Sequence, residues 1–191
     1  DASATLPNSY NSVENITPLE TPLSSTINGA ALATPVFLSL YVENDLRLDK
    51  YFAETDEKGF RKNKKAGSNN YLCTFRVGEI YLTAAEAAAR LGELSQARTR
   101  LLELMRKRYA PEAYEAKSVV VNAMDKEALV QEILDERARE LAFEGHRWFD
   151  LRRSTRPRLE KVLDGTRYVL EENDARYTLA IPKEAIEANP G

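Results

Sequence analysis

The sequence predicts a mainly α-helical fold with long loops and a small β-hairpin near the C-terminus. Three observations support this class. Between residues 77 and 109, and again from residue 125, apolar residues recur at the three- and four-residue spacing of amphipathic helices. Ser, Thr, Asn, Pro and Gly gather instead in the first 70 residues, as is typical of loops. Two short runs rich in β-branched and aromatic residues occur from residue 166 onward.

Length and composition bound the class of protein. The 191 residues are 43% hydrophobic and 30% charged, which is typical of a globular domain with a core of its own. The net charge of -3 argues against a nucleic-acid-binding protein, because phosphate binding needs a basic surface. One cysteine, Cys73, and one histidine, His146, exclude an intramolecular disulfide and a structural zinc cluster, and no cofactor is predicted. Cys73 lies in an apolar run and is expected to be a packing residue.

The first 70 residues are expected to be rich in loops. Residues 1 to about 33 show no sustained period and are interpreted as irregular. Thr34-Pro35 combines an N-cap with a proline at the first helical position and predicts a short helix near 35–42. Residues 44–47 are expected to end that helix, and residues 54–70 form a second polar loop.

A helical hairpin is predicted within residues 71–109. An extended stretch leads into a helix over Val77–Leu91, and Gly92 suits the left-handed position that ends it. Ser95 is predicted to cap the second helix, whose apolar face carries Ala97, Leu101, Leu104 and Met105. The pattern of small and large residues resembles a tetratricopeptide repeat, which needs a neighbour because one repeat cannot bury both faces. An unrelated pair of antiparallel helices is the alternative.

A third helix is predicted to begin at Asp125 and to run to about Glu144. Its apolar stripe is formed by Val130, Ile133, Leu134 and Leu141. Arg137 and Glu144 fall inside the stripe and Glu140 lies at its edge. Buried charges are costly unless they are paired, so we predict that Arg137 binds Glu140, Glu144 or a carboxylate from another helix. Trp148 would share the stripe if the helix continued.

The C-terminal region is predicted to contain a β-hairpin. The chain becomes irregular after Trp148, and a short helix is one option for Leu159–Leu163. Thr166–Leu170 and Tyr177–Ile181 are predicted to pair as strands across a polar turn. One helical turn is expected from Pro182.

Two interpretations of the charged cluster around His146 remain. Glu144 with His146, or Glu144 with Asp150, is a candidate general acid–base pair. The alternative is a buried ion network that fixes the third helix against the repeat. The sequence favours the network, since no nucleophile, metal-ligand set or phosphate-binding glycine loop accompanies the histidine.

Four motifs, in order, give the chain a family resemblance. Residues 140–152 read ELAFEGHRWFDLR, and residues 76–87 read RVGEIYLTAAEA. The ending from Ile181 to Gly191 and a weaker match over 44–52 complete the set. Together they cover about residues 35–191, and this region resembles the SusD/RagB family. The charged and aromatic residues of these motifs are expected to hold the fold as a structural network: Arg76, Glu79, Glu86, Arg137, Glu140, Glu144, Arg147, Trp148 and Asp150.

The resemblance implies a nutrient-binding protein that is not an enzyme. Such proteins are mostly α-helical, with four tetratricopeptide units and long loops. They are lipid-anchored on the outward-facing surface of the outer membrane of Bacteroidetes-type bacteria. Each forms a lid on a SusC-like TonB-dependent transporter and captures glycans or, in some members, peptides. This chain lacks the lipidated cysteine and the earlier repeats. We therefore expect residues 1–191 to be the C-terminal part of such a domain, divided into 1–70, 71–109 and 125–191, with its N-terminal part missing.

Loop residues are the candidates for ligand contact, because sugars need aromatic faces for their C–H groups and amides or charges for their hydroxyls. The candidates are Tyr10, Asn11, Asn44 and Tyr51, with Phe60, Asn69, Asn70 and Tyr71 as further groups of this kind. Tyr10-Asn11 is preferred, since neither has an evident role in the core. Tyr51, with Phe52, has the alternative role of anchoring its loop. The basic run Arg61–Lys65 is expected to be solvated and able to attract acidic sugars or peptide carboxylates.

Two other functions compete with capture for import. A tetratricopeptide scaffold would bind partner peptides and would show further repeats of about 34 residues. A glycosidase would place two carboxylates about 5 to 10 Å apart in an open cleft. The predicted burial of Glu140 and Glu144 argues against the glycosidase.

Overall fold

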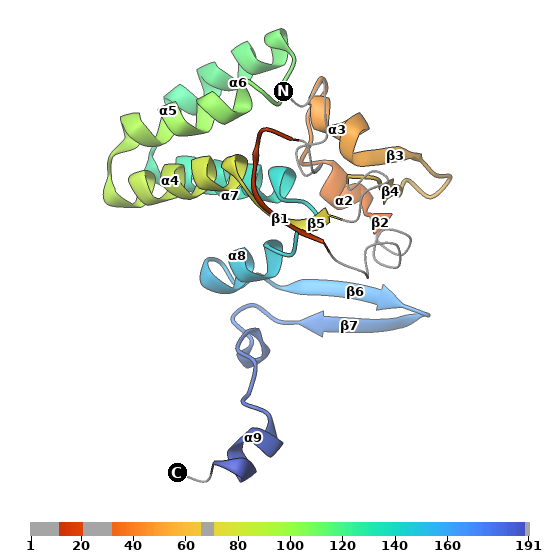
Figure 1. Cartoon of the computed structure of the whole chain (residues 1–191). Helices are drawn as coiled ribbons and strands as arrows, with labels where there is room; N and C mark the ends of the chain where they lie inside the picture. Colours follow the sequence, from red (N-terminus) through yellow and green to blue (C-terminus); the bar gives the residue numbers. More distant parts are fainter. Residues whose placement is uncertain (1–11, 21–31, 66–70, 190–191) are drawn as a thin grey trace. The chain divides into compact units, whose positions relative to one another are not determined.

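The computed structural model describes residues 12–20, 32–65 and 71–189. The fold is mainly α-helical with short strands, as predicted (Figure 1). The chain divides into two compact units, Asp1–His146 and Arg147–Gly191, and each is described by itself. Within the described ranges, every helix is too short or too polar to cross a bilayer.

Short antiparallel strands occupy much of the region that was predicted to be loop. Strand β1 (Asn15–Glu20) pairs with β5 (Tyr71–Arg76), whose extended conformation was predicted. Strands β2 (Leu32–Ala33), β4 (Arg61–Asn63) and β3 (Phe52–Thr55) form a sheet in that order. The sequence prediction missed these strands because segments of two to four residues show no period-two pattern.

Two short helices lie between β2 and β3. Helix α2 (Pro35–Leu38) begins as predicted, with Thr34 Oγ1 accepting a hydrogen bond from the Phe37 N–H, but it ends before residue 42. Asp45 is the N-cap of helix α3 (Leu46–Tyr51). The sequence analysis had expected residues 44–47 to end a helix. Asn44 lies between the two helices and has a φ of 64°, which is the left-handed conformation.

The predicted helical hairpin is confirmed. Helix α4 (Val77–Leu91) ends at Gly92, whose φ of 86° is the left-handed conformation predicted for it. Helix α5 (Leu94–Met105) begins after Glu93 rather than at Ser95, and no side chain caps it. The two helices pack along their length around buried residues that include Leu82, Ala85, Ala89, Ala97, Leu101 and Met105. A two-residue turn leaves no room for the expected Ser95 cap.

Helix α6 (Pro111–Ala123) was not predicted, and Val121 is its buried residue. Helix α7 (Lys126–Glu140) packs on α4 and begins as predicted, because Asp125 Oδ1 accepts a hydrogen bond from the Ala128 N–H at 2.9 Å. It ends before residue 144. Phe143 and Gly145 both have positive φ, at 61° and 87°, so the chain turns there instead of continuing the helix.

The C-terminal unit corrects the predicted hairpin. After helix α8 (Arg147–Arg153), strand β6 (Leu159–Leu163) pairs with β7 (Thr166–Leu170), so Leu159–Leu163 is a strand and not a helix. The turn is Asp164-Gly165, with φ of 48° and 76°, the two positive values that a tight type I′ turn requires. This Asp-Gly pair is the signal that the sequence analysis overlooked.

The predicted strand Tyr177–Ile181 is therefore wrong. Tyr177 ends a short 3-10 helix (Ala175–Tyr177), and helix α9 (Lys183–Ala188) follows. The Tyr177 ring stacks on Trp148 with centroids 5.1 Å apart, and its hydroxyl donates to the Pro157 carbonyl. Trp148 thus packs within its own unit and does not extend the stripe of α7.

Candidate functional site

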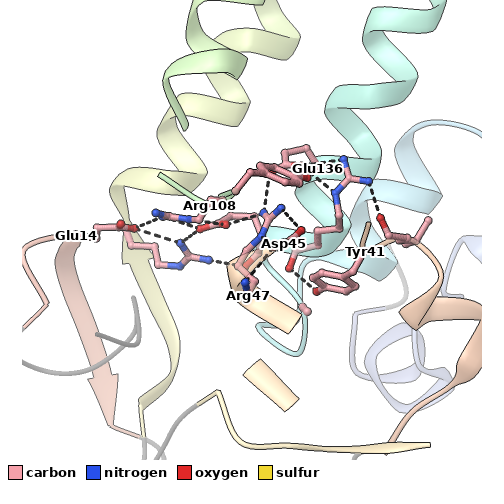
Figure 2. A network of polar contacts seen from close by, with 12 residues as sticks. Glu14, Tyr41, Asp45, Arg47, Arg108 and Glu136 are labelled. Carbon is pink, nitrogen blue, oxygen red and sulfur yellow. Dashed lines mark hydrogen bonds and ion pairs between the residues drawn. The ribbon is translucent and has the colours of Figure 1, made fainter. Parts of the chain in front are cut away.

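A network of buried ions surrounds the C-terminal end of α7 (Figure 2). Glu140 is fully buried at its centre. Its carboxylate accepts hydrogen bonds from Arg47 Nη1 at 3.0 Å and from Arg108 Nε and Nη2 at 2.9 and 3.0 Å. Arg76 Nη1 donates to the same carboxylate. Three guanidinium groups from three different segments therefore converge on one carboxylate.

Glu136 extends this network by one helical turn. Its carboxylate accepts from Arg47 Nη1 at 2.7 Å, from the Tyr109 hydroxyl at 2.8 Å and from Arg139 Nε at 2.8 Å. Asp45 holds the other side of Arg47, with contacts of 2.9 and 2.8 Å to Nε and Nη2 (Figure 2). Arg47 thereby ties the start of α3 to α7, although 89 residues separate it from Glu136.

Glu144 lies in the turn after α7 and is also enclosed. Arg76 Nε and Nη2 contact its two oxygens at 3.0 and 2.8 Å, and Lys65 Nζ donates to it as well. Lys65 is 1% exposed and donates further to the carbonyl oxygens of Glu140 and Ala142. The expectation of a fully solvated basic run is therefore wrong at Lys65, since the interior supplies the acceptors that its ammonium group needs.

The titration of these groups follows from their partners. Burial raises the pKa of Glu136, but the attraction of Arg47 and Arg139 is larger in sum and lowers it to about 2. Burial opposes ionisation of Glu140 and Glu144 too, and their cationic partners still hold each pKa below its ordinary value. Burial lowers the pKa of Lys65 to about 8, against the attraction of Glu144. Carboxylates of this kind stay ionised and covered, so they are poor general acids.

Glu144, His146 and Asp150 each have a partner outside the predicted acid–base pairs. His146 Nδ1 lies 3.7 Å from Glu79 Oε1, while Glu144 faces Arg76 and Lys65. Asp150 belongs to the C-terminal unit, where it contacts Arg153 at 2.6 Å. Within the described parts of the chain, no group of three or more His, Cys, Asp or Glu side chains is arranged to hold a metal ion.

The prediction for Arg137 named three kinds of carboxylate partner: Glu140, Glu144 or a carboxylate from another helix. Arg137 is buried, and its Nη1 donates to Thr83 Oγ1 at 3.2 Å. The cations that bind Glu140 and Glu144 are instead Arg47, Lys65, Arg76 and Arg108. Of these only Arg76 was assigned to the network from the sequence. Arg47 and Lys65 come from segments interpreted as a helix end and a loop, and Arg108 comes from the end of the predicted hairpin. No local pattern connects them to α7.

The remaining residues of the predicted structural network come from both units. Glu86 is buried on α4, and its Oε1 lies 2.8 Å from Arg90 Nε. Arg147 and Trp148 belong to α8 in the C-terminal unit. That these residues share one network with Glu140 stays a prediction.

The four residues predicted to contact ligand have different positions. Tyr10 and Asn11 lie outside the described residues, as do Asn69 and Asn70. Tyr51 is 0% exposed, in contact with Phe52 and with Lys65 Nζ 4.3 Å from its ring centroid, so it packs in the interior and does not face a ligand. This outcome matches the alternative role as an anchor. Asn44 is exposed.

Asn44 lies on an open groove of about 650 Å³. The groove is lined by Glu43, Asn44, Asp45, Leu46, Leu48, Asp49, Lys50 and Lys64. The Lys64 N–H donates to the Tyr51 carbonyl at 2.8 Å, which holds the two sides together. Asp45 belongs both to the groove and to the ion network, so the network fixes the start of α3 under the groove. We call this the Asn44 groove.

Together these features define an α-helical protein whose central charges are enclosed and whose polar groove is open to solvent. The fold is similar to that of a SusD-like carbohydrate binding protein from Bacteroides vulgatus ATCC 8482, solved at 1.70 Å resolution. The TM-score is 0.53 at 20% sequence identity, over 82% of this chain and 40% of that one. This chain thus spans about 40% of the length of that protein.

The sequence itself identifies the family. The sequence model of the SusD family matches residues 37–191, which is most of the chain. The chain therefore belongs to the SusD family, as the motifs predicted. A search of curated proteins found no match.

Proposed function

We propose that this protein captures glycans at the cell surface and delivers them to a SusC-like TonB-dependent transporter, and that it is not an enzyme. The match of residues 37–191 to the SusD family is the observation that carries this proposal. The fold is shared with a SusD-like carbohydrate binding protein, which supports carbohydrate as the ligand class. The outward-facing surface of the outer membrane is the location that this role requires.

The enclosed carboxylates support a binding role over hydrolysis. A glycosidase needs one carboxylic acid with a raised pKa and a second carboxylate open to substrate. Glu140 and Glu144 are buried against cations and have lowered pKa values, so neither meets the requirement. Hydrolysis of a polysaccharide that disappears in a Glu144→Gln variant would contradict this part of the proposal.

The Asn44 groove is the surface that we propose for ligand contact. An amide offers two donors and one acceptor oxygen, which suits the hydroxyl groups of a sugar. Asn44 is itself in the left-handed conformation between α2 and α3, and this backbone geometry determines where its side chain points. Leu46 and Leu48 give the groove an apolar part beside these polar groups.

A glycan and peptide array with the full chain tests the ligand class, followed by calorimetry with any glycan that binds. Asn44→Gly removes the amide and keeps the left-handed backbone, because glycine adopts positive φ freely. We expect about three- to tenfold weaker binding, the effect of losing one or two hydrogen bonds. Asn173→Gly is the matched control, since Asn173 is also exposed and has a φ of 56° but lies in the C-terminal unit.

Three outcomes of this experiment contradict the proposal. Binding of peptides in place of glycans would show that the protein captures peptides for import and not carbohydrates. Capture of folded proteins alone would favour the tetratricopeptide scaffold. Equal weakening by both Asn→Gly variants would remove the Asn44 groove as the contact surface.

A further inference from the structure

The charges of the Asn44 groove are not equivalent, because two of its three carboxylates already have cationic partners. Asp45 contacts Arg47 at 2.9 and 2.8 Å inside the protein. Asp49 Oδ1 lies 3.2 Å from both terminal nitrogens of Arg61. Glu43 is the third carboxylate of the groove, and it forms no ion pair with the residues that the structure describes.

Two ammonium groups line the same groove. Lys50 lies in the last turn of α3, and Lys64 follows strand β4. Lys64 is exposed and Lys65 is buried, which agrees with an extended backbone that sends consecutive side chains to opposite sides. Among the described residues neither Lys50 nor Lys64 has a recorded carboxylate partner. Each is therefore available to an anion from solution.

Among the residues that the structure describes, those that line the groove carry no aromatic side chain. The nearby rings of Tyr41, Tyr51 and Phe52 are packed in the interior, where they contact one another edge to face. Neutral sugars gain much of their affinity from flat aromatic surfaces, so this groove must bind through hydrogen bonds and charge. A ligand with carboxylate groups would satisfy both lysines.

We propose that the Asn44 groove binds an acidic oligosaccharide, with Lys50 and Lys64 contacting its carboxylate or sulfate groups and Asn44 its hydroxyls. This inference rests on the proposed function and names the ligand class within it. Glu43 opposes such a ligand by like-charge repulsion and limits its affinity.

Calorimetry with the full chain tests the inference, using hexagalacturonate as the acidic probe and maltohexaose as a neutral probe of equal length. Hexagalacturonate is expected to bind more tightly. Lys50→Gln and Lys64→Gln should each weaken it about three- to tenfold, as expected for a charge-assisted hydrogen bond. Glu43→Gln should strengthen it about two- to fivefold, because it removes a repulsive charge. Affinity should fall as ionic strength rises from about 0.05 M to about 0.5 M.

Lys62→Gln is the matched control, because Lys62 is exposed and lies outside the groove. Equal weakening by Lys62→Gln and Lys64→Gln would show a diffuse charge effect and overturn the inference. Tighter binding of maltohexaose, unchanged in the lysine variants, would overturn the inference but leave the proposed function intact. Failure of every carbohydrate to bind would overturn both.

Discussion

Replacing Glu140 with Gln is the most direct test of the ion network. Glutamine has nearly the same shape as glutamate, so the change removes a charge and leaves packing intact. Glu140 accepts four side-chain hydrogen bonds, two from Arg108 and one each from Arg47 and Arg76. The variant leaves three buried guanidinium groups around a neutral amide, whose nitrogen is itself a donor.

The expected loss follows from these contacts. A hydrogen bond to a charged group contributes about 1 kcal/mol more than a neutral one, so the four contacts give about 4 kcal/mol. This agrees with the cost of about 3–5 kcal/mol for removing one partner of a buried ion pair. Since domains of this size are stable by about 5–15 kcal/mol, we expect the variant to be close to unfolding.

Chemical denaturation measures this loss. Far-UV circular dichroism follows the helices, most of which lie in the N-terminal unit, whereas Trp148 fluorescence follows the C-terminal unit. Glu103→Gln is the control, because Glu103 forms an exposed pair with Arg100 that is worth less than about 1 kcal/mol. Equal unfolding free energies for Glu140→Gln and Glu103→Gln would refute the argument that the network stabilises the fold.

Two further predictions concern the same network. Because the pKa of Glu136 is depressed from 4.5 to about 2, its stabilisation is complete above its unfolded pKa and is lost as pH falls from about 4.5 to about 2. Acid titration should therefore show that the free energy of unfolding falls by about 3 kcal/mol in this pH window. A Glu136→Gln variant should not show this fall. Gly78→Ala should cost about 1–3 kcal/mol by overpacking, since a Cβ there would lie 2.7 Å from Arg76 Nη1 and 2.9 Å from Glu140 Oε1. Chemical denaturation measures this cost. Gly92→Ala is the comparison, because no atom lies within 4 Å of a Cβ at that position and its cost reports backbone strain without crowding.

Sequence patterns predicted the parts of the fold that depend on local chemistry. Thr34 and Asp125 begin helices because their side chains accept hydrogen bonds from nearby N–H groups. Gly92 ends α4 because it adopts positive φ without strain. Each signal lies within four residues of the feature that it determines. Asp164-Gly165 is a signal of the same kind, and its omission shifted the predicted hairpin.

The partners in the network were less predictable, because they depend on contacts between distant segments. The positions of Glu140 and Glu144 on the apolar stripe indicated that they needed cations. Arg47 lies 93 residues from Glu140, and Lys65 lies 79 residues from Glu144. A helical pattern identifies a buried charge, but only the packed fold determines which cation reaches it.

The network also bears on the ligand capture that we propose. Asp45 accepts a hydrogen bond from the Arg47 N–H at 3.0 Å and binds the Arg47 side chain, which in turn reaches Glu136 and Glu140. The residue before it, Asn44, is held in its left-handed conformation on the groove. A groove anchored in this way loses little conformational entropy on binding, since its backbone is already fixed. Enclosed charges and an open groove are therefore two parts of one arrangement, in which interior ion pairs fix the backbone that carries the polar groups of the proposed binding surface.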